Sequence, residues 1–278
     1  HYTPALGLPE LRQAISDYYQ QRFGANVAPE RIVITPGASG ALQLVLGVLI
    51  NPGDQVLMAD PGYPCNRHFV RLFEGEAVSV NVDASTSYQL TVELIEQHWT
   101  DKTAAVMVAS PSNPTGTIVP PDELLAINEL VKKQNGHLIV DEIYNELIYG
   151  GDASTVLELS DDVFVINSFS KYYGMTGWRI GWMVAPSSYV RTIDKLAQNI
   201  FLAASTLAQY AALAAFLPET QAVLEQRRQA FMRRRDFLMP ALRNLGFDIP
   251  VIPQGAFYLY AGCQRFSNDS YAFAIDLL

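Results

Sequence analysis

The apolar positions of this chain follow a helical period in some stretches and form short unbroken runs in others. Between Leu8 and Phe23, the residues Leu11, Ile15, Tyr18 and Tyr19 recur at helical spacing. Short apolar runs rich in β-branched residues predict buried strands instead. The expected strands cover 31–35, 55–59, 77–82, 104–109, 137–140, 163–168 and 180–184. The expected helices cover 8–23, 65–73 and 121–134, with another from the turn at 36–40 to about 50.

Strands and helices alternate for most of the chain, which predicts an α/β fold: a three-layer αβα sandwich with a mostly parallel central sheet. The alternation stops after residue 187, and residues 187–245 have an almost wholly helical pattern, followed by an extended run from Ala256 to Tyr260. We therefore expect a large domain over residues 1–230 and an incomplete α+β small domain over 231–278, with a boundary between about 225 and 240. The chain begins inside a loop and ends inside an apparent helix, so we expect both ends of the fold to extend beyond this span.

Composition narrows the classes of function. The chain has 278 residues, of which 49% are hydrophobic, and 28 acidic against 19 basic residues give a net charge of −9. A phosphate backbone repels such a chain, so we expect no nucleic-acid partner. The apolar stretch 41–50 has only half of the roughly 20 residues that a membrane span requires, so we expect no membrane association.

The two cysteines also carry information. Cys65 and Cys263 lie far apart and match no metal-binding or redox spacing, so we expect no metal site. Free thiols are typical of a reducing compartment, which predicts a cytoplasmic protein.

In open α/β sheets, ligands bind where loops leave the carboxyl ends of the strands. After the first strand, Gly37, Ala38 and Ser39 form a small-residue turn that opens a helix. Its free N–H groups and the helix dipole suit a phosphate. Glycine and serine are also ordinary turn and N-cap residues, so this turn alone favours a purely structural role.

Two further loops carry candidate ligand groups. Tyr63 follows the second strand, where its ring can stack on a flat heterocycle or simply cover the core. Asn113 stands between two prolines after a buried strand, where its amide can donate a hydrogen bond to a phenolate oxygen. Asparagine before proline is also a common turn residue.

Asp141 directly follows an apolar strand. An acid at such a position is costly to bury unless a cation or a protonated group faces it. A pyridine nitrogen is such a group, and Tyr144 is close enough in sequence to reach the 3-oxygen of the same ring. The alternative, a surface acid pair with Glu142, is disfavoured by the apolar run.

The next expected strand leads into Ser168, Ser170 and Lys171, and Arg179 follows eight residues after the lysine. A loop lysine is usually only solvated. Two serines and an arginine beside it provide anion ligands, which makes a role for the lysine in a site more plausible.

The stretch 168–181, Ser-Phe-Ser-Lys-Tyr-Tyr-Gly-Met-Thr-Gly-Trp-Arg-Ile-Gly, resembles the lysine signature of the class I/II aminotransferases of the aspartate aminotransferase-like type, pyridoxal phosphate fold type I. The segments 2–12, 110–116 and 141–144 resemble other motifs of the same family. The resemblance covers essentially the whole chain, in the family's order and spacing.

The resemblance implies pyridoxal 5′-phosphate as cofactor and a role for each matching residue. Lys171 resembles the lysine that forms the internal aldimine and later moves the proton, and Asp141 resembles the partner of the pyridinium nitrogen. Asn113 and Tyr144 resemble the pair at the 3-oxygen, and Tyr63 takes the stacking position. The remaining implied ligands belong to the phosphate: Gly37, Ala38, Ser39, Ser168, Ser170 and Arg179, with Tyr2 reaching into the neighbouring subunit of a homodimer.

The family implies transfer of an amino group between an amino acid and a 2-oxo acid, without indicating which ones. The arginine that grips the substrate carboxylate in relatives has no counterpart here, and Arg265 lies too early to take its place. We therefore expect this span to be weakly active.

Three alternatives stay open. A β-lyase resembling cystathionine lyases would share the Lys171 chemistry, and a non-catalytic pyridoxal phosphate-binding regulator domain would share the fold. A nicotinamide-binding enzyme is disfavoured because no Gly-x-Gly-x-x-Gly follows the first strand.

Overall fold

A seven-stranded sheet forms the centre of the computed structural model, which describes residues 1–151 and 153–278. The strands in spatial order are β1-β7-β6-β5-β4-β2-β3, and only β7 runs antiparallel to its neighbours. Their bounds are β1 Ile32–Thr35, β2 Gln55–Asp60, β3 Glu76–Asn81, β4 Thr103–Ala109, β5 His137–Asp141, β6 Phe164–Ser168 and β7 Gly181–Val184. The expected mostly parallel sheet is confirmed.

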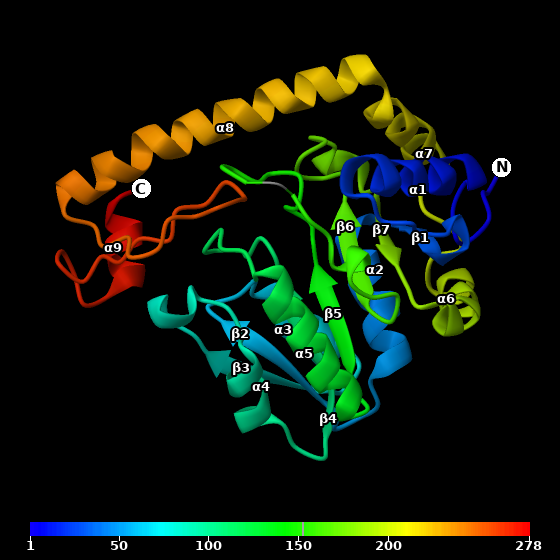
Figure 1. Ribbon diagram of the computed structural model, residues 1–278, viewed down its shortest axis with the longest axis horizontal. Coiled ribbons are helices and arrows are strands. Elements are labelled where there is room, and N and C mark those ends of the chain that lie inside the picture. The colour runs from blue at the N-terminus through cyan, green and yellow to red at the C-terminus, as the bar shows by residue number, and fades with distance from the viewer. Residues whose placement is uncertain (152) are drawn as a thin grey trace.

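Helices cover both faces of the sheet (Figure 1). They are α1 Pro9–Phe23, α2 Gly37–Leu49, α3 Cys65–Leu72, α4 Val92–His98, α5 Pro121–Lys133, α6 Ser187–Ile200, α7 Thr206–Leu213, α8 Pro218–Leu245 and α9 Ser270–Asp276. The sequence reading did not anticipate α4. That helix is short, and Thr91 caps it by accepting a hydrogen bond from the Leu94 N–H at 3.3 Å.

Side chains that alternate along each strand divide the core into two layers. On β5, Leu138 and Val140 join the cluster that includes α1, α4, α5 and α7, whereas Ile139 joins the cluster that includes α2, α3 and α6. Because successive residues of a strand point to opposite faces, a fully apolar strand is the pattern expected between two helical layers. The three-layer αβα sandwich is therefore confirmed.

The strand register brings the candidate residues to one edge of the sheet. Asp141, the last residue of β5, pairs with Ala109 on β4 and with Ile166 on β6. Ser168, the last residue of β6, pairs with Gly181 on β7. The loops that follow β4, β5 and β6 therefore leave the sheet side by side.

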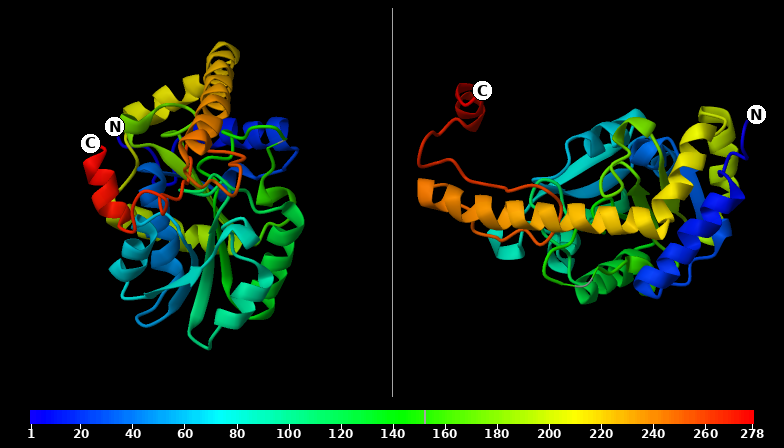
Figure 2. Two further views of the ribbon diagram at one scale, coloured as in Figure 1. Left: turned by 90° about the vertical axis from the view of Figure 1, so that its left-hand side faces the viewer. Right: turned by 90° about the horizontal axis from the view of Figure 1, so that it is seen from above.

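Residues 1–217, here called the body, contrast with residues 218–278, here called the arm. The long helix α8 passes over the body and carries the chain to α9, which lies beyond the sheet (Figures 1 and 2). Leu224 is the only residue of α8 that is buried. In the described part of the chain no helix has the length and apolar character needed to cross a membrane.

The extended run expected from Ala256 to Tyr260 forms no strand in the described structure. Gly255 makes one isolated antiparallel bridge with Ile148, and Ala256 then adopts a left-handed φ of 59°. That conformation turns the chain, so an apolar, aromatic-rich sequence does not continue along a sheet. The expected boundary between large and small domains, near residue 230, falls inside α8.

Candidate active site

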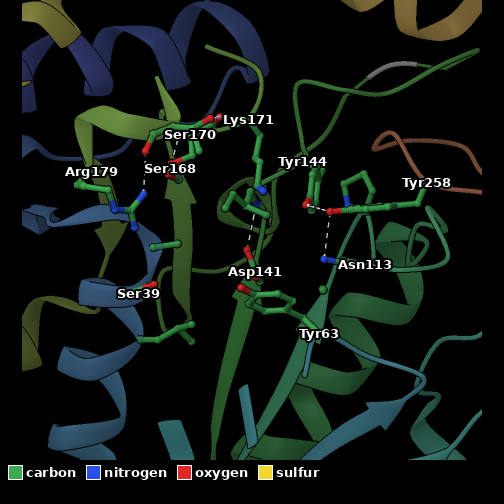
Figure 3. Close-up of a pocket in the computed structure, with 16 residues that line it drawn as sticks. Ser39, Tyr63, Asn113, Asp141, Tyr144, Ser168, Ser170, Lys171, Arg179 and Tyr258 are labelled. Carbon is green, nitrogen blue, oxygen red and sulfur yellow. Dashed lines mark hydrogen bonds between the residues drawn. The ribbon is translucent and has the colours of Figure 1, made fainter. Parts of the chain in front are cut away.

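A cavity of about 180 Å³ opens at the carboxyl edge of β4, β5 and β6 (Figure 3). The cavity is lined by ten of the site residues that were predicted from the sequence: Ala38, Ser39, Tyr63, Asn113, Asp141, Tyr144, Ser168, Ser170, Lys171 and Arg179. Six more lining residues were not anticipated: Leu42, Ala109, Pro111, Ile143, Thr176 and Tyr258. Residues separated by more than 130 positions in the chain thus share one pocket.

Asp141 is the buried acid of the pocket. Its carboxylate accepts one hydrogen bond from the described protein, from the Ile143 N–H at 3.1 Å. Burial raises the pKa of Asp141 to about 6, and the Ile143 N–H and the charge of Lys171 offset part of that increase. The structure therefore holds an acid at the pocket floor that a cationic or N–H-bearing ligand would stabilise in its charged form.

Lys171 follows β6 and reaches into the same cavity, with its amine above Asp141 in Figure 3. Its Nζ lies 5.6 Å from the ring centroid of Tyr144 and 5.6 Å from that of Phe257. Two aromatic faces therefore flank the amine, and they supply no proton acceptor other than the Tyr144 hydroxyl.

Small and cationic groups gather at the opposite end of the pocket. Ala38 and Ser39 lie in the first turn of α2, where backbone N–H groups lack helical partners. The Ser168 hydroxyl accepts from the Ser170 N–H at 3.1 Å, which holds the two serines together. This end of the pocket suits a ligand with a negative charge.

Arg179 joins this end in an unusual backbone conformation, with a left-handed φ of 51°. Its guanidinium donates to the Thr176 carbonyl at 3.0 Å. Gly37 does not line the cavity, but a Cβ added there would lie 2.6 Å from Arg179 Nη2. Gly37, itself at a φ of 71°, therefore leaves the space that the arginine side chain uses.

Asn113, Tyr144 and Tyr258 form a hydrogen-bonded group on the far side of the pocket (Figure 3). Asn113 Nδ2 donates to Tyr258 Oη at 3.3 Å, and the two tyrosine hydroxyls are 2.7 Å apart. Tyr258 belongs to the arm, 114 residues from Tyr144 in sequence. No local motif marked Tyr258, because its role depends on where the arm returns to the body.

Tyr63 lies at the mouth, with 43% of its surface exposed. A hydrogen bond with Cys65, followed by partial burial, raises its pKa to about 12, so the phenol stays neutral and presents a flat ring to the cavity. Ile143, which sequence reasoning missed, was detectable because it lies between Asp141 and Tyr144. Tyr2 does not line this pocket and is 82% exposed at the start of the chain.

Two more acids lie behind the pocket. Glu142 accepts from the Thr155 hydroxyl at 2.8 Å and from the Val156 N–H at 2.8 Å, yet burial raises its pKa to about 8. Burial likewise raises the pKa of Glu146 to about 7. Neither lines the cavity, and no cluster of three or more potential metal ligands occurs in the described residues.

Comparison with known proteins agrees with this geometry over the whole chain. The family model described as aminotransferase class I and II matches residues 1–277. A valine–pyruvate aminotransferase of Mycobacterium tuberculosis is 40% identical over 279 aligned residues, which cover 100% of this chain and 72% of that protein. A (5-formylfuran-3-yl)methyl phosphate transaminase of Methanocaldococcus jannaschii is 36% identical, with the same coverage of each chain.

The fold is similar to solved structures of the same class. An aspartate aminotransferase from Thermus thermophilus, solved with maleate, superposes with a TM-score of 0.94 at 31% identity. The match covers 100% of this chain and 73% of that one. Sequence and three-dimensional similarity thus point to the same class of protein.

Proposed function

The chain belongs to the class I and II aminotransferases, and from that premise we propose that it moves an amino group between an amino acid and a 2-oxo acid with pyridoxal 5′-phosphate as cofactor. Membership also makes the chain a transaminase-type enzyme. The proposal concerns three points: the cofactor, the residues that hold it and the class of substrates.

The observation that carries the proposal is the state of Asp141. The Asp141 carboxylate is buried, accepts one hydrogen bond and has its pKa raised to about 6, because the charge of Lys171 and the Ile143 N–H offset its burial only in part. It makes no salt bridge with the described residues, so it can take a closer cationic partner. A protonated ring nitrogen supplies that partner, and it would stabilise the ionised form of Asp141. The same pocket provides small and cationic groups for a phosphate at one end, and an amide and a hydroxyl for a ring oxygen at the other. The residues present therefore fit the cofactor.

Each residue has a task that its chemistry allows. Ser168, Ser170 and Arg179, with the N–H groups of Ala38 and Ser39 and the space left by Gly37, would hold the phosphate. Asn113 and Tyr144 would donate to the ring oxygen. Tyr63 and Ile143 offer a flat and an apolar surface for the two faces of the ring.

When bound, pyridoxal phosphate supplies a reactive aldehyde carbon and a ring that withdraws electrons from it. The protein must supply an amine and a base, and two strongly basic side chains line the cavity, Lys171 and Arg179. A guanidinium keeps its proton, so Lys171 is the group that can take a proton and return it. The aromatic rings beside its Nζ limit the positions that this amine can adopt.

Substrate identity follows only at the level of class. The relatives named above act on different molecules, so their names give no single substrate for this chain. An amino acid donor and a 2-oxo acid acceptor are what the proposed chemistry requires.

We also propose that two copies of the chain form a homodimer, with Tyr2 reaching the phosphate end of the partner's pocket. Tyr2 is exposed beside α7, where the Thr206 hydroxyl donates to the His1 carbonyl at 3.2 Å. Leu207 and Tyr210 on α7 are 78% and 58% exposed. Apolar surface of this kind is typical of an interface. Light scattering that gave the mass of one chain at micromolar concentration would refute the dimer.

The test of the cofactor site is covalent labelling. With pyridoxal phosphate added, we expect a visible absorption band, and borohydride should fix the label on Lys171. Lys171→Ala should lose the fixed label completely, whereas Lys195→Ala, at an exposed position on α6, should keep it. Peptide mapping by mass spectrometry identifies the labelled residue. A fixed label of equal yield in Lys171→Ala would sink the proposal.

A further inference from the structure

The arm inserts one hydroxyl group into the pocket that the body otherwise builds. Tyr258 Oη receives a hydrogen bond from Asn113 and shares one with the Tyr144 hydroxyl, at 3.3 and 2.7 Å (Figure 3). Backbone hydrogen bonds hold the segment just before it, from the Gly255 N–H to the Gly116 carbonyl at 2.9 Å and from the Ala256 N–H to the Leu147 carbonyl at 2.8 Å. The position of the hydroxyl is therefore set by the fold.

The hydrogens on Asn113, Tyr144 and Tyr258 determine which hydrogen bonds the Tyr258 hydroxyl can form. Each tyrosine hydroxyl has one hydrogen, and the Asn113 amide has two. If Tyr144 donates its hydrogen to a ligand oxygen, its own oxygen can still accept the hydrogen of Tyr258. The Tyr258 oxygen can then accept one Asn113 hydrogen, while the other Asn113 hydrogen also points to the ligand. Every donor is satisfied, and the direction of each bond is fixed.

The direction of the Tyr144 hydrogen bond is important because this hydroxyl is buried. Tyr144 is 2% exposed, so no solvent shell competes for its hydrogen. Burial raises the pKa of Tyr144 above its ordinary value, so the hydroxyl keeps its hydrogen and remains a donor over the pH range of most enzymes. In a buried chain of hydroxyls, each hydrogen bond polarises and strengthens the next.

We propose that Tyr258 is a positioning residue, which directs the Tyr144 hydrogen toward the cofactor ring oxygen by donating its own hydrogen to Tyr144. The inference rests on the proposed function, because it assumes that Asn113 and Tyr144 face that oxygen. Tyr258 does not touch the reacting atoms in this arrangement; it acts through Tyr144. Tyr258 is the arm residue that lines the pocket, and through it the arm contributes to cofactor binding.

The test compares Tyr258→Phe with Tyr260→Phe, a tyrosine two residues later whose ring contacts Tyr88 at 5.4 Å between ring centroids. We expect Tyr258→Phe to weaken pyridoxal phosphate binding roughly 3- to 10-fold, the effect of losing one hydrogen bond. The pH midpoint of the visible absorption band should rise by roughly half a unit to one unit. A weaker donor leaves more negative charge on the ring oxygen, which holds a neighbouring proton more tightly. Tyr260→Phe should match the parent in both measurements.

A double-variant cycle separates positioning from simple packing. If Tyr258 acts through Tyr144, then Tyr258→Phe should add little further shift in a Tyr144→Phe background. Equal shifts in both backgrounds would overturn the inference. Tighter binding by Tyr258→Phe with an unchanged midpoint would also overturn it, because Tyr258 would then be a placeholder that the cofactor displaces.

The measurements give a different result if the proposed function itself is wrong. A parent protein that develops no visible band with pyridoxal phosphate overturns the cofactor proposal, and this inference with it. A parent band together with an unshifted Tyr258→Phe band overturns this inference alone. Far-UV circular dichroism and thermal unfolding without cofactor confirm that each variant is folded.

Discussion

The body and the arm use their helices in different ways. In the body, α5 buries Leu124, Ile127, Leu130 and Val131 against the sheet within 13 residues. In the arm, α8 has 28 residues and buries only Leu224. Most helical stability in proteins comes from packing an apolar face, so the body carries its own core whereas the arm depends on a few contacts with the body. We propose that this difference marks the division between the large and small domains.

The site shows the same division. The body supplies the acid, the amine and the anion-binding groups of the pocket, and the arm supplies Tyr258. A rigid sheet edge holds groups that must be placed accurately, while a side chain from the arm completes one hydrogen-bond network. The charged residues that line the pocket, Asp141, Lys171 and Arg179, therefore all come from the body.

The largest expected contrast is in stability. Phe164→Ala removes a fully buried ring from β6 and should lower the free energy of unfolding by about 3–5 kcal/mol. Phe237→Ala, on α8 with the ring 77% exposed, should change it by less than about 0.5 kcal/mol. Urea unfolding followed by circular dichroism measures both. Similar losses in the two variants would show that the arm is packed as tightly as the body.

The pH dependence of stability gives a second, smaller contrast. Glu142, whose ordinary pKa is 4.5, has its pKa raised to about 8 in the folded body. A raised folded pKa means that the folded state binds more protons than the unfolded state between these two values. Stability from this group is fully present below pH 4.5 and is lost as the pH rises through about 8. The loss approaches about 1.4 kcal/mol per pH unit for one proton.

Glu142→Gln tests this effect, since the amide does not titrate. Its unfolding free energy should fall less steeply between pH 5 and pH 8 than that of the parent. Glu219→Gln, at an exposed position at the start of α8, is the matched control and should follow the parent curve. Parent stability that increases with pH across this window would contradict the prediction.

The smallest expected effect concerns the contact between α8 of the arm and the body. Arg228 on α8 donates to the Ile148 carbonyl at 2.6 Å and pairs with Glu225 at 2.6 Å. Arg228→Met keeps the aliphatic stem and loses these bonds, which should destabilise the protein by about 1 kcal/mol. Arg233→Met, at an exposed position on the same helix, should have no measurable effect on thermal unfolding. Equal melting temperatures for the two variants would show that other contacts hold the arm to the body.

Parts of the site were predictable because their signal is local. Asp141 ends an apolar strand, and Lys171 and Arg179 lie in one short motif. Their neighbours in the sequence are therefore enough to identify them as candidate site residues. Gly37 does not line the cavity and leaves space for Arg179, and its expected contact with the ligand stays a prediction. Tyr258 carried no local signal, because its contact partners lie 114 and 145 residues away.

The sequence by itself determined the order of the strands and of the helices other than α4 along the chain, the three layers and most of the residues that line the pocket. Those features follow from periodicity and from residues that lie next to strand ends, and both are short-range properties. Only the tertiary structure decided that residues 256–260 form no strand and that α8 is largely exposed. It also decided that an arm hydroxyl meets Asn113 and Tyr144. Those outcomes depend on contacts between segments far apart in the chain, where long-range packing overrides local preference.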